Sequence, residues 1–471
     1  MKKIYLLLLF AGIVLRFLFH FIFPTFNGDE IALGNNIKYS NYIELLYPLK
    51  FGQSSPPLYL LLQKFIISFS PFSFWISIKI LSFISSVTGV IFFYLLMRKY
   101  QFKIAFLILF IIILFNPFIV SNSLTVKQYT IDLTGIILLI FFYKSNWFLR
   151  YGWIFFMIWG LFSNIGLFAC AGYLLFVYLT QKSYLNFESL VIFLKSNLLT
   201  FLAPFPYIVY FIWYMNQDGA AEMKSYMVNY WNDSFIPLDL SIFKYLIYTV
   251  HGLWIFLLNS FEIWGIFLML LMIPFFLNLK NKNLLFKQEI LLLFSILFVH
   301  LVLNICQLYP FSDRLYLYLS PLFLLILGSS ISKLIEYEVF KKKSNIFLVI
   351  ISITTLSLYM AYTPSNDNDV VKLYSKLINL EEKNIYLTEK SMECINSFND
   401  FTDDEFKKKI IFEPLDLSLQ KSKYIVSRVG KKIKYNVSSP EEEIIQNLIN
   451  KEKIVKLNSV NGYNIYLINS H

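Results

Sequence analysis

Several features that mark other protein classes are scarce or absent in this sequence. Cysteine occurs only at Cys170, Cys306 and Cys394, too few and too scattered for a disulfide framework or a zinc site. The 471 residues contain no glycine-rich nucleotide-binding motif, no internal repeat and no low-complexity segment. No small-residue cleavage site follows the first apolar run, so we interpret that run as an uncleaved helix and not as a signal peptide.

Apolar residues dominate the composition. Hydrophobic residues make up 57% of the chain and charged residues only 15%, and the mean hydropathy is +0.59. A soluble domain could not bury that much apolar surface. The composition therefore predicts a mostly α-helical, polytopic membrane protein, and the lipid bilayer is one of its expected partners.

The net charge of +11 belongs to one part of the chain. Residues 1–361 carry 25 Lys+Arg and 14 Asp+Glu, whereas residues 362–471 carry 16 of each and are neutral. Basic loops on the cytoplasmic side of a membrane account for such an excess. Nucleic acid is therefore not an expected partner.

The apolar runs predict about eleven transmembrane helices. The segment 152–180 is interrupted by Ser163 to Gly166, and we therefore divide it into a tight hairpin. With the N-terminus inside, the inner loops hold more Lys and Arg than the outer loops, and the C-terminus lies outside. The predicted spans lie near residues 4–23, 72–97, 104–121, 130–143, 152–163, 166–180, 198–215, 246–277, 290–308, 315–332 and 346–361.

Composition also predicts two domains. Residues 1–361 form the transmembrane domain, with a long first outer loop at 24–71. In residues 362–471 charge rises and the apolar runs shorten to strand length, which predicts a small extracytoplasmic α/β domain. Its predicted strands are Asn384–Thr388, Lys409–Phe412, Tyr424–Arg428 and Asn464–Ile468, and its predicted helices are Val370–Leu380 and Pro440–Asn450.

An acidic pair, Asp29 and Glu30, lies six residues after the end of the first predicted span. Carboxylates at a membrane edge are costly unless they have a function. A positioned carboxylate can take a proton from an acceptor hydroxyl or amine, and two adjacent carboxylates can bind a divalent cation. The alternative is a pair of solvated loop residues.

Two further motifs fall on the same predicted outer side. The first, FGQSSPPLYLLL, offers Gln53, Ser54 and Ser55 as hydrogen-bonding groups suited to sugar hydroxyls. The second, VKQYTID, places Lys127, Tyr129 and Asp132 at the start of a short span, where they need polar partners. Lys127 could hold a lipid phosphate, and Asp132 could pair with Lys127 or orient a ligand. The alternative for FGQSSPPLYLLL is a surface turn.

A fourth motif, YPFSDRLYLYLSP, places Arg314 at the predicted outer membrane edge. The planar guanidinium suits a phosphate or pyrophosphate. The alternative is a salt bridge to Asp313 or an extension of the Arg314 side chain to lipid headgroups. Together the four motifs place acids, hydrogen-bonding groups, a lysine and an arginine on one membrane face, which indicates a site for a lipid phosphate and a polar acceptor.

The order of these motifs resembles that of the GT-C membrane glycosyltransferases, especially the bacterial relatives of dolichyl-phosphate-mannose protein mannosyltransferases and the lipid A aminoarabinose transferases. The resemblance covers roughly residues 1–330. It implies that Asp29, with Glu30 beside it, acts as base or metal ligand, and that Lys127 and Arg314 lie near the phosphate of a polyprenyl-phosphate sugar. For a divalent metal the candidates are Glu30 and His251, and no histidine pairs obviously with Glu30.

We therefore predict an inverting glycosyltransferase of the cytoplasmic membrane. It would move one sugar from a polyprenyl-phosphate donor to a glycan, lipid or protein acceptor on the outer face. Asp29 and Glu30 are the predicted catalytic residues, and Gln53, Lys127, Tyr129, Asp132 and Arg314 the predicted substrate-binding residues. A nucleotide sugar is not expected. The alternatives are a lipid-linked glycan flippase or transporter, whose charged residues would lie near the membrane midplane, and a glycan polymerase.

Overall fold

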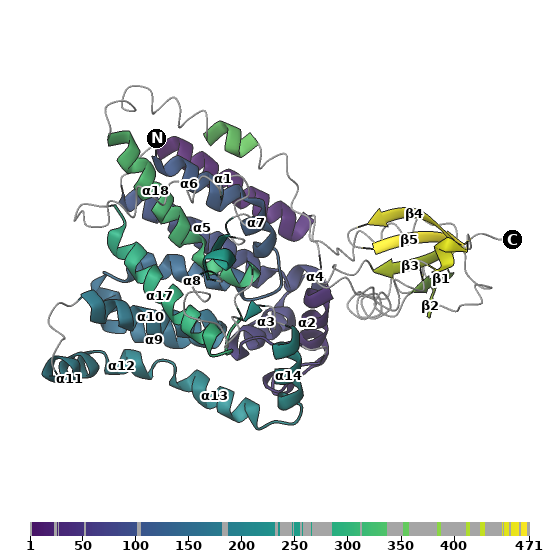
Figure 1. The fold of residues 1–471 in the computed structure, drawn as a ribbon, viewed down its shortest axis with the longest axis horizontal. Helices are drawn as coiled ribbons and strands as arrows, with labels where there is room; N and C mark the ends of the chain where they lie inside the picture. Colours follow the sequence, from purple (N-terminus) through teal and green to yellow (C-terminus); the bar gives the residue numbers. More distant parts are fainter. Residues whose placement is uncertain are drawn as a thin grey trace.

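The structure is a computed structural model that is mostly helical (Figure 1). The described residues are 2–22, 26, 28–50, 53–100, 105–180, 187–230, 234–235, 247, 249–254, 257, 265, 285–310, 313–336, 352–357, 384–387, 411–414, 424–428, 445, 447–451, 454–460 and 463–468.

The first half of the chain forms a run of helices separated by short turns. Their bounds are α1 Lys2–Phe17, the π-helical turn η1 Leu18–Ile22, α2 Gly28–Tyr39, the 3-10 turn η2 Glu44–Leu46, α3 Pro57–Phe69, α4 Phe74–Ser77, α5 Ile80–Lys99, α6 Ala105–Phe115, α7 Pro117–Ser123, α8 Tyr129–Phe142, α9 Asn146–Phe162 and α10 Asn164–Thr180. The later helices are α11 Phe187–Ser196, α12 Leu198–Leu202, α13 Phe205–Met215, α14 Ala220–Tyr230, α17 Lys287–Ile305, the 3-10 helix η4 Asp313–Leu319 and α18 Ser320–Glu336.

The described residues confirm a multi-pass membrane protein. Five helical stretches are long and apolar enough to cross a membrane, and six if the bent pair α6–α7 is one span. The count of about eleven spans stays a prediction, because most of 246–277 and 346–361 lies outside the described residues. The five stretches are Lys2–Ile22, Phe74–Lys99, Leu198–Met215, Lys287–Ile305 and Leu315–Lys333.

Small residues let the helices of the bundle approach closely. A methyl group added at Gly172 in α10 would lie 2.6 Å from the backbone of Ile296 in α17. One added at Gly89 in α5 would lie 2.7 Å from the hydroxyl of Thr134 in α8. Between membrane helices, where lipid is as apolar as the side chains, such close backbone packing stabilises association. The close packing places α5 beside α8 and α10 beside α17.

The predicted interruption at Ser163 is confirmed. Helix α9 ends at Phe162 and α10 begins at Asn164, with Ser163 in an extended conformation between them. The Ser163 hydroxyl accepts a hydrogen bond from the Ile165 amide (3.0 Å), which satisfies one of the open amides at the start of α10. Both helices are longer than the predicted runs 152–163 and 166–180.

A buried arginine supports the bend between α6 and α7. Pro117 cannot donate a backbone hydrogen bond, so carbonyl groups at the end of α6 are left open. The Arg16 guanidinium donates to the carbonyls of Leu114 (2.7 Å) and Ile113 (3.0 Å) and to the Ser86 hydroxyl (2.7 Å). Arg16 therefore ties α1 and α5 to the 43° bend at α6–α7.

A buried carboxylate joins three helices at the opposite end of α5 and α8. Glu289, at the start of α17, accepts hydrogen bonds from the hydroxyls of Tyr100 (2.8 Å) and Tyr143 (3.0 Å) and from Lys144 (3.0 Å). Only 3% of the Glu289 side chain is exposed. These contacts hold the C-terminal ends of α5 and α8 against α17. The acidic pair of α2 lies near the opposite, N-terminal ends of these two helices.

The C-terminal region contains a mixed five-stranded sheet in the order β2-β1-β3-β5-β4. The strand β1 pairs in parallel with β2 and β3, while β5 pairs antiparallel with β3 and β4. Three strands, β1, β3 and β5, lie within one residue of their predicted bounds, whereas β2 overlaps the predicted strand Lys409–Phe412 only at residues 411–412. The strand β4, IVKLNSV, is an edge strand that the sequence analysis did not predict: Ile454 and Val455 are both apolar and Asn458 and Ser459 are both polar, so the alternation typical of a strand is broken. The bounds are β1 Asn384–Leu387, β2 Ile411–Pro414, β3 Tyr424–Arg428, β4 Ile454–Val460 and β5 Tyr463–Ile468.

The sheet packs at the end of the bundle that holds α2. Ile465 of β5 belongs to the same apolar cluster as Phe26, Ile31 and Tyr59. Figure 1 shows the sheet beyond α2 and α4. Residues 447–450 are helical as predicted, whereas the predicted helix Val370–Leu380 lies outside the described residues. The domain boundary near 361 stays a prediction.

Candidate active site

The acidic pair begins helix α2, which sequence analysis did not predict as a helix. Asp29 and Glu30 lie in its first turn, where the helix dipole stabilises negative charge. Neighbouring residues on a helix point about 100° apart, so the two carboxylates face different surroundings. The Asp29 side chain is 36% exposed, whereas that of Glu30 is 1% exposed.

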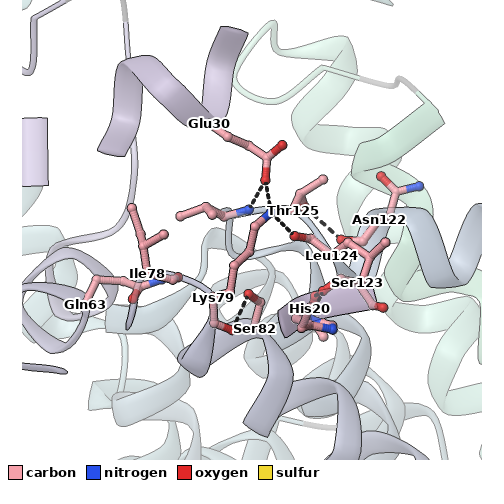
Figure 2. A network of polar contacts seen from close by, with 12 residues as sticks. His20, Glu30, Gln63, Ile78, Lys79, Ser82, Asn122, Ser123, Leu124 and Thr125 are labelled. Atoms are coloured by element: carbon pink, nitrogen blue, oxygen red, sulfur yellow. Dashed lines mark hydrogen bonds and ion pairs between the residues drawn. The ribbon is translucent and has the colours of Figure 1, made fainter. Parts of the chain in front are cut away.

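Glu30 forms a buried ion pair with Lys79. The Lys79 ammonium lies 2.8 Å from Glu30 Oε1, and it also donates to the carbonyl of Leu124 (2.6 Å). The same Glu30 oxygen accepts a hydrogen bond from the Val126 amide (2.7 Å). Figure 2 shows these contacts converging from α2, from the residue before α5 and from the α7–α8 turn. The Glu30–Lys79 pair thus joins three segments that are far apart in sequence.

The α7–α8 turn is also held from the first span. His20 Nε2 lies 3.0 Å from the carbonyl of Ser123, and His20 Nδ1 lies 2.7 Å from the carbonyl of Arg16. Within the turn, the Thr125 hydroxyl donates to the carbonyl of Asn122 (2.8 Å). Contacts from η1, from α2 and from the residue before α5 therefore fix the backbone before Lys127 (Figure 2).

Lys127 connects three of the predicted motifs. Its ammonium donates to Gln53 Oε1 (3.0 Å) and lies 3.9 Å from Asp29 Oδ2. Only 12% of the Lys127 side chain is exposed, so solvent screens this pair less than an exposed one. The fold therefore brings together Asp29, Gln53 and Lys127, which we call the polar cluster.

Asp132 differs from its predicted pairing. It is 4% exposed and accepts a hydrogen bond from the Ser163 hydroxyl, so its partner is the α9–α10 break and not Lys127. Tyr129 is also 4% exposed at the start of α8. The predicted substrate contacts of Tyr129 and Asp132 stay predictions.

The motif YPFSDRLYLYLSP lies next to α8, the helix that carries Tyr129 and Asp132. Arg314 belongs to η4, which packs against α8 and α7, but its side chain lies outside the described residues. The phosphate contact predicted for Arg314 stays a prediction.

The metal candidates gain no support from the described part of the chain. His251 lies in a helical turn and is exposed, and Glu30 is held by Lys79 and Val126. Among the described residues, no group of three or more His, Cys, Asp or Glu side chains is arranged to hold a metal ion.

Lys79 is the functional candidate that sequence analysis missed. It interrupts the apolar run 72–97, and a lysine inside an apolar span requires a buried partner. That signal could have identified Lys79 as a paired residue. It could not have identified Glu30 as the partner, because the two residues meet only in the folded chain.

Comparison with known proteins found a solved structure with a similar fold. No protein-family model matches the chain, and no curated protein matches it in sequence. The crystal structure of ArnT from Cupriavidus metallidurans bound to undecaprenyl phosphate is similar over 99% of this chain and 96% of that chain. The TM-score is 0.51 and the sequence identity 10%. At that identity the likeness shows the fold alone: the chain folds like ArnT, in line with the resemblance that the motif order indicated.

Proposed function

We propose that the protein transfers one sugar from a polyprenyl-phosphate carrier to an acceptor at the outer face of the cytoplasmic membrane. The observation that carries the proposal is the polar cluster, in which a half-exposed carboxylate and a nearly buried ammonium lie 3.9 Å apart in a GT-C fold. A protein of that fold has been crystallised with undecaprenyl phosphate. The cluster offers a base and a cation side by side, as transfer from a lipid phosphate requires.

The proposed reaction is a single displacement. Asp29 takes the proton from the acceptor hydroxyl or amine while the acceptor atom attacks the anomeric carbon. The bond from that carbon to the phosphate oxygen breaks, the configuration inverts, and polyprenyl phosphate leaves. Lys127 stabilises the negative charge that develops on the phosphate. Its hydrogen bond to Gln53 keeps the ammonium in place.

The Glu30–Lys79 pair has a positioning role in this proposal. It fixes the start of α2, which carries Asp29, against the turn that precedes Lys127. A shift of one segment would separate base and cation, and small misplacements of catalytic groups are costly.

A panel of donors tests the proposed function. Purified protein in nanodiscs is incubated with radiolabelled polyprenyl-phosphate sugars and with glycan, lipid or peptide acceptors. We expect release of polyprenyl phosphate together with a glycosylated product for at least one pair. A flippase would move the intact lipid-linked sugar across vesicles without releasing the phosphate, and a polymerase would extend a glycan by many units. Either outcome, with no single-sugar product, would contradict the proposal.

Replacing Lys127 with alanine should weaken use of the donor more than use of the acceptor. The loss of one charge-assisted hydrogen bond corresponds to roughly 1.5–3 kcal/mol, seen as a lower kcat/KM for the donor. Arg314→Ala should act on the same phosphate, so the two effects should not add in the double variant. Lys50→Ala is the control, because Lys50 is an exposed lysine of the first long loop, three residues before Gln53. Additive effects of the two substitutions, or an equal loss of kcat/KM for donor and acceptor, would contradict the proposal that Lys127 and Arg314 bind the same phosphate.

A further inference from the structure

A pocket lies between the first long loop and α13. Ser54 and Ser55 line it on one side, and Tyr207, Tyr210 and Tyr214 line it on the other. The other described lining residues are an asparagine, prolines, leucines and aromatic residues, and none of the lining residues is charged. The pocket therefore suits a neutral ligand and has no cation for a phosphate.

Ser55 has a hydrogen-bonding group that needs a partner. Its hydroxyl oxygen is buried and finds no hydrogen-bond partner among the described residues. A buried hydroxyl without a partner costs stability, so such groups usually bind water or a ligand. The hydroxyl lies directly before Pro56 and Pro57, where helix α3 begins.

The tyrosine side of the pocket is held in place. The hydroxyl of Tyr207 donates to Asn164 Oδ1 (2.7 Å), and that of Tyr210 donates to the carbonyl of Leu46 (3.1 Å). These bonds orient aromatic rings toward a pocket whose other wall carries hydroxyl groups. Flat aromatic faces opposite a few fixed polar groups are the usual surroundings of a small ring-shaped ligand.

The pocket is close to both the membrane and the polar cluster. Helix α13 belongs to the apolar stretch Leu198–Met215, in which only 6% of the residues are buried, so we infer that its exposed apolar side faces lipid. Figure 1 shows α13 along one edge of the bundle. Ser54 directly follows Gln53, which contacts Lys127. Since consecutive Cα atoms lie about 3.8 Å apart, the chain leads directly from the polar cluster to the Ser54–Ser55 wall of the pocket.

We propose that this pocket binds a neutral sugar ring, with Ser55 bonding a ring hydroxyl and Tyr214 contacting the ring face. The inference rests on the proposed function, because it gives one of the two reacting sugars its place next to Asp29. The ring could come from the acceptor or from the sugar of the donor, and both have the same neutral polyhydroxylated chemistry.

Direct binding tests the pocket without any transfer reaction. Protein in nanodiscs is mixed with methyl glycosides of glucose, galactose and mannose, and binding is followed by saturation-transfer difference NMR. We expect binding to the unmodified protein, a loss of binding in Tyr214→Leu, and a weakening of roughly 2- to 12-fold in Ser55→Ala, the range for one neutral hydrogen bond.

Matched controls separate binding from folding. Ser68→Ala and Tyr151→Leu change exposed residues outside the pocket and should leave binding unchanged. Ser55→Ala removes a hydroxyl without a partner and should not lower the melting temperature. If no methyl glycoside binds, or if Ser55→Ala and folded Tyr214→Leu bind normally, the pocket proposal is wrong. Such a result leaves the donor-panel assay unaffected.

Kinetics in the transfer assay assign the ring to its source. If Ser55→Ala raises KM for the acceptor alone, the pocket holds the acceptor sugar. If it raises KM for the donor alone, the pocket holds the donor sugar. Unchanged KM values for both substrates would overturn the proposal even where transfer itself is observed.

Discussion

Replacing Asp29 with asparagine is expected to lower the rate of sugar transfer by about 100-fold or more, the usual loss when a general base is removed. The change keeps the size of the side chain and removes its ability to take a proton. Because Asp29 is half-exposed in the first turn of α2, the protein should still fold. Single-turnover rates with saturating donor, together with the melting temperature, measure the two effects separately.

Asp218→Asn is the matched control for this experiment. Asp218 is exposed in the turn before α14, so its replacement should change neither rate nor stability. If Asp29→Asn transfers sugar at the normal rate, Asp29 is not the base and the single-displacement proposal for this site fails. Glu30 would be a poor substitute, because its Oε1 oxygen is held by Lys79 and the Val126 amide.

Replacing Lys79 with methionine is expected to destabilise the protein by roughly 3–5 kcal/mol, because the carboxylate of Glu30 then stays buried without its cation. Glu30→Gln should also destabilise it, since the Lys79 ammonium is 1% exposed. The double variant Glu30→Gln, Lys79→Met should recover most of the stability, because removing both charges removes the uncompensated burial. Tryptophan fluorescence during chemical and thermal unfolding measures the change.

The transfer rate of the double variant tests the positioning role. If the Glu30–Lys79 pair positions the segments that carry Asp29 and Lys127, the stable double variant should still transfer sugar more slowly than the unmodified protein. Lys50→Met, at an exposed lysine, should change stability by less than about 0.5 kcal/mol. A Lys79→Met protein of normal stability would contradict the assignment of a buried ion pair. A double variant of normal activity would leave the pair a purely structural role.

Much of the architecture could be predicted from local sequence. Apolar runs of span length identify membrane helices such as Lys2–Ile22 and Lys287–Ile305, because each run must satisfy its own backbone hydrogen bonds in lipid. The interruption at Ser163 and the strand Tyr424–Arg428 also lie where the sequence predicts them. These features depend on neighbouring residues alone, and so does the location of the polar motifs.

The roles of individual side chains depended on the tertiary structure. Asp29 and Glu30 are adjacent acids that the sequence does not distinguish. In the fold, Asp29 lies in the half-exposed polar cluster, whereas Glu30 pairs with buried Lys79. Asp132 lies five residues from Lys127 but bonds to Ser163. By itself the sequence determined a helical membrane protein with acids, hydrogen-bonding groups and cations at defined positions. Only the tertiary structure decided which of them meet, because burial and ion pairing depend on contacts between segments that are distant along the chain.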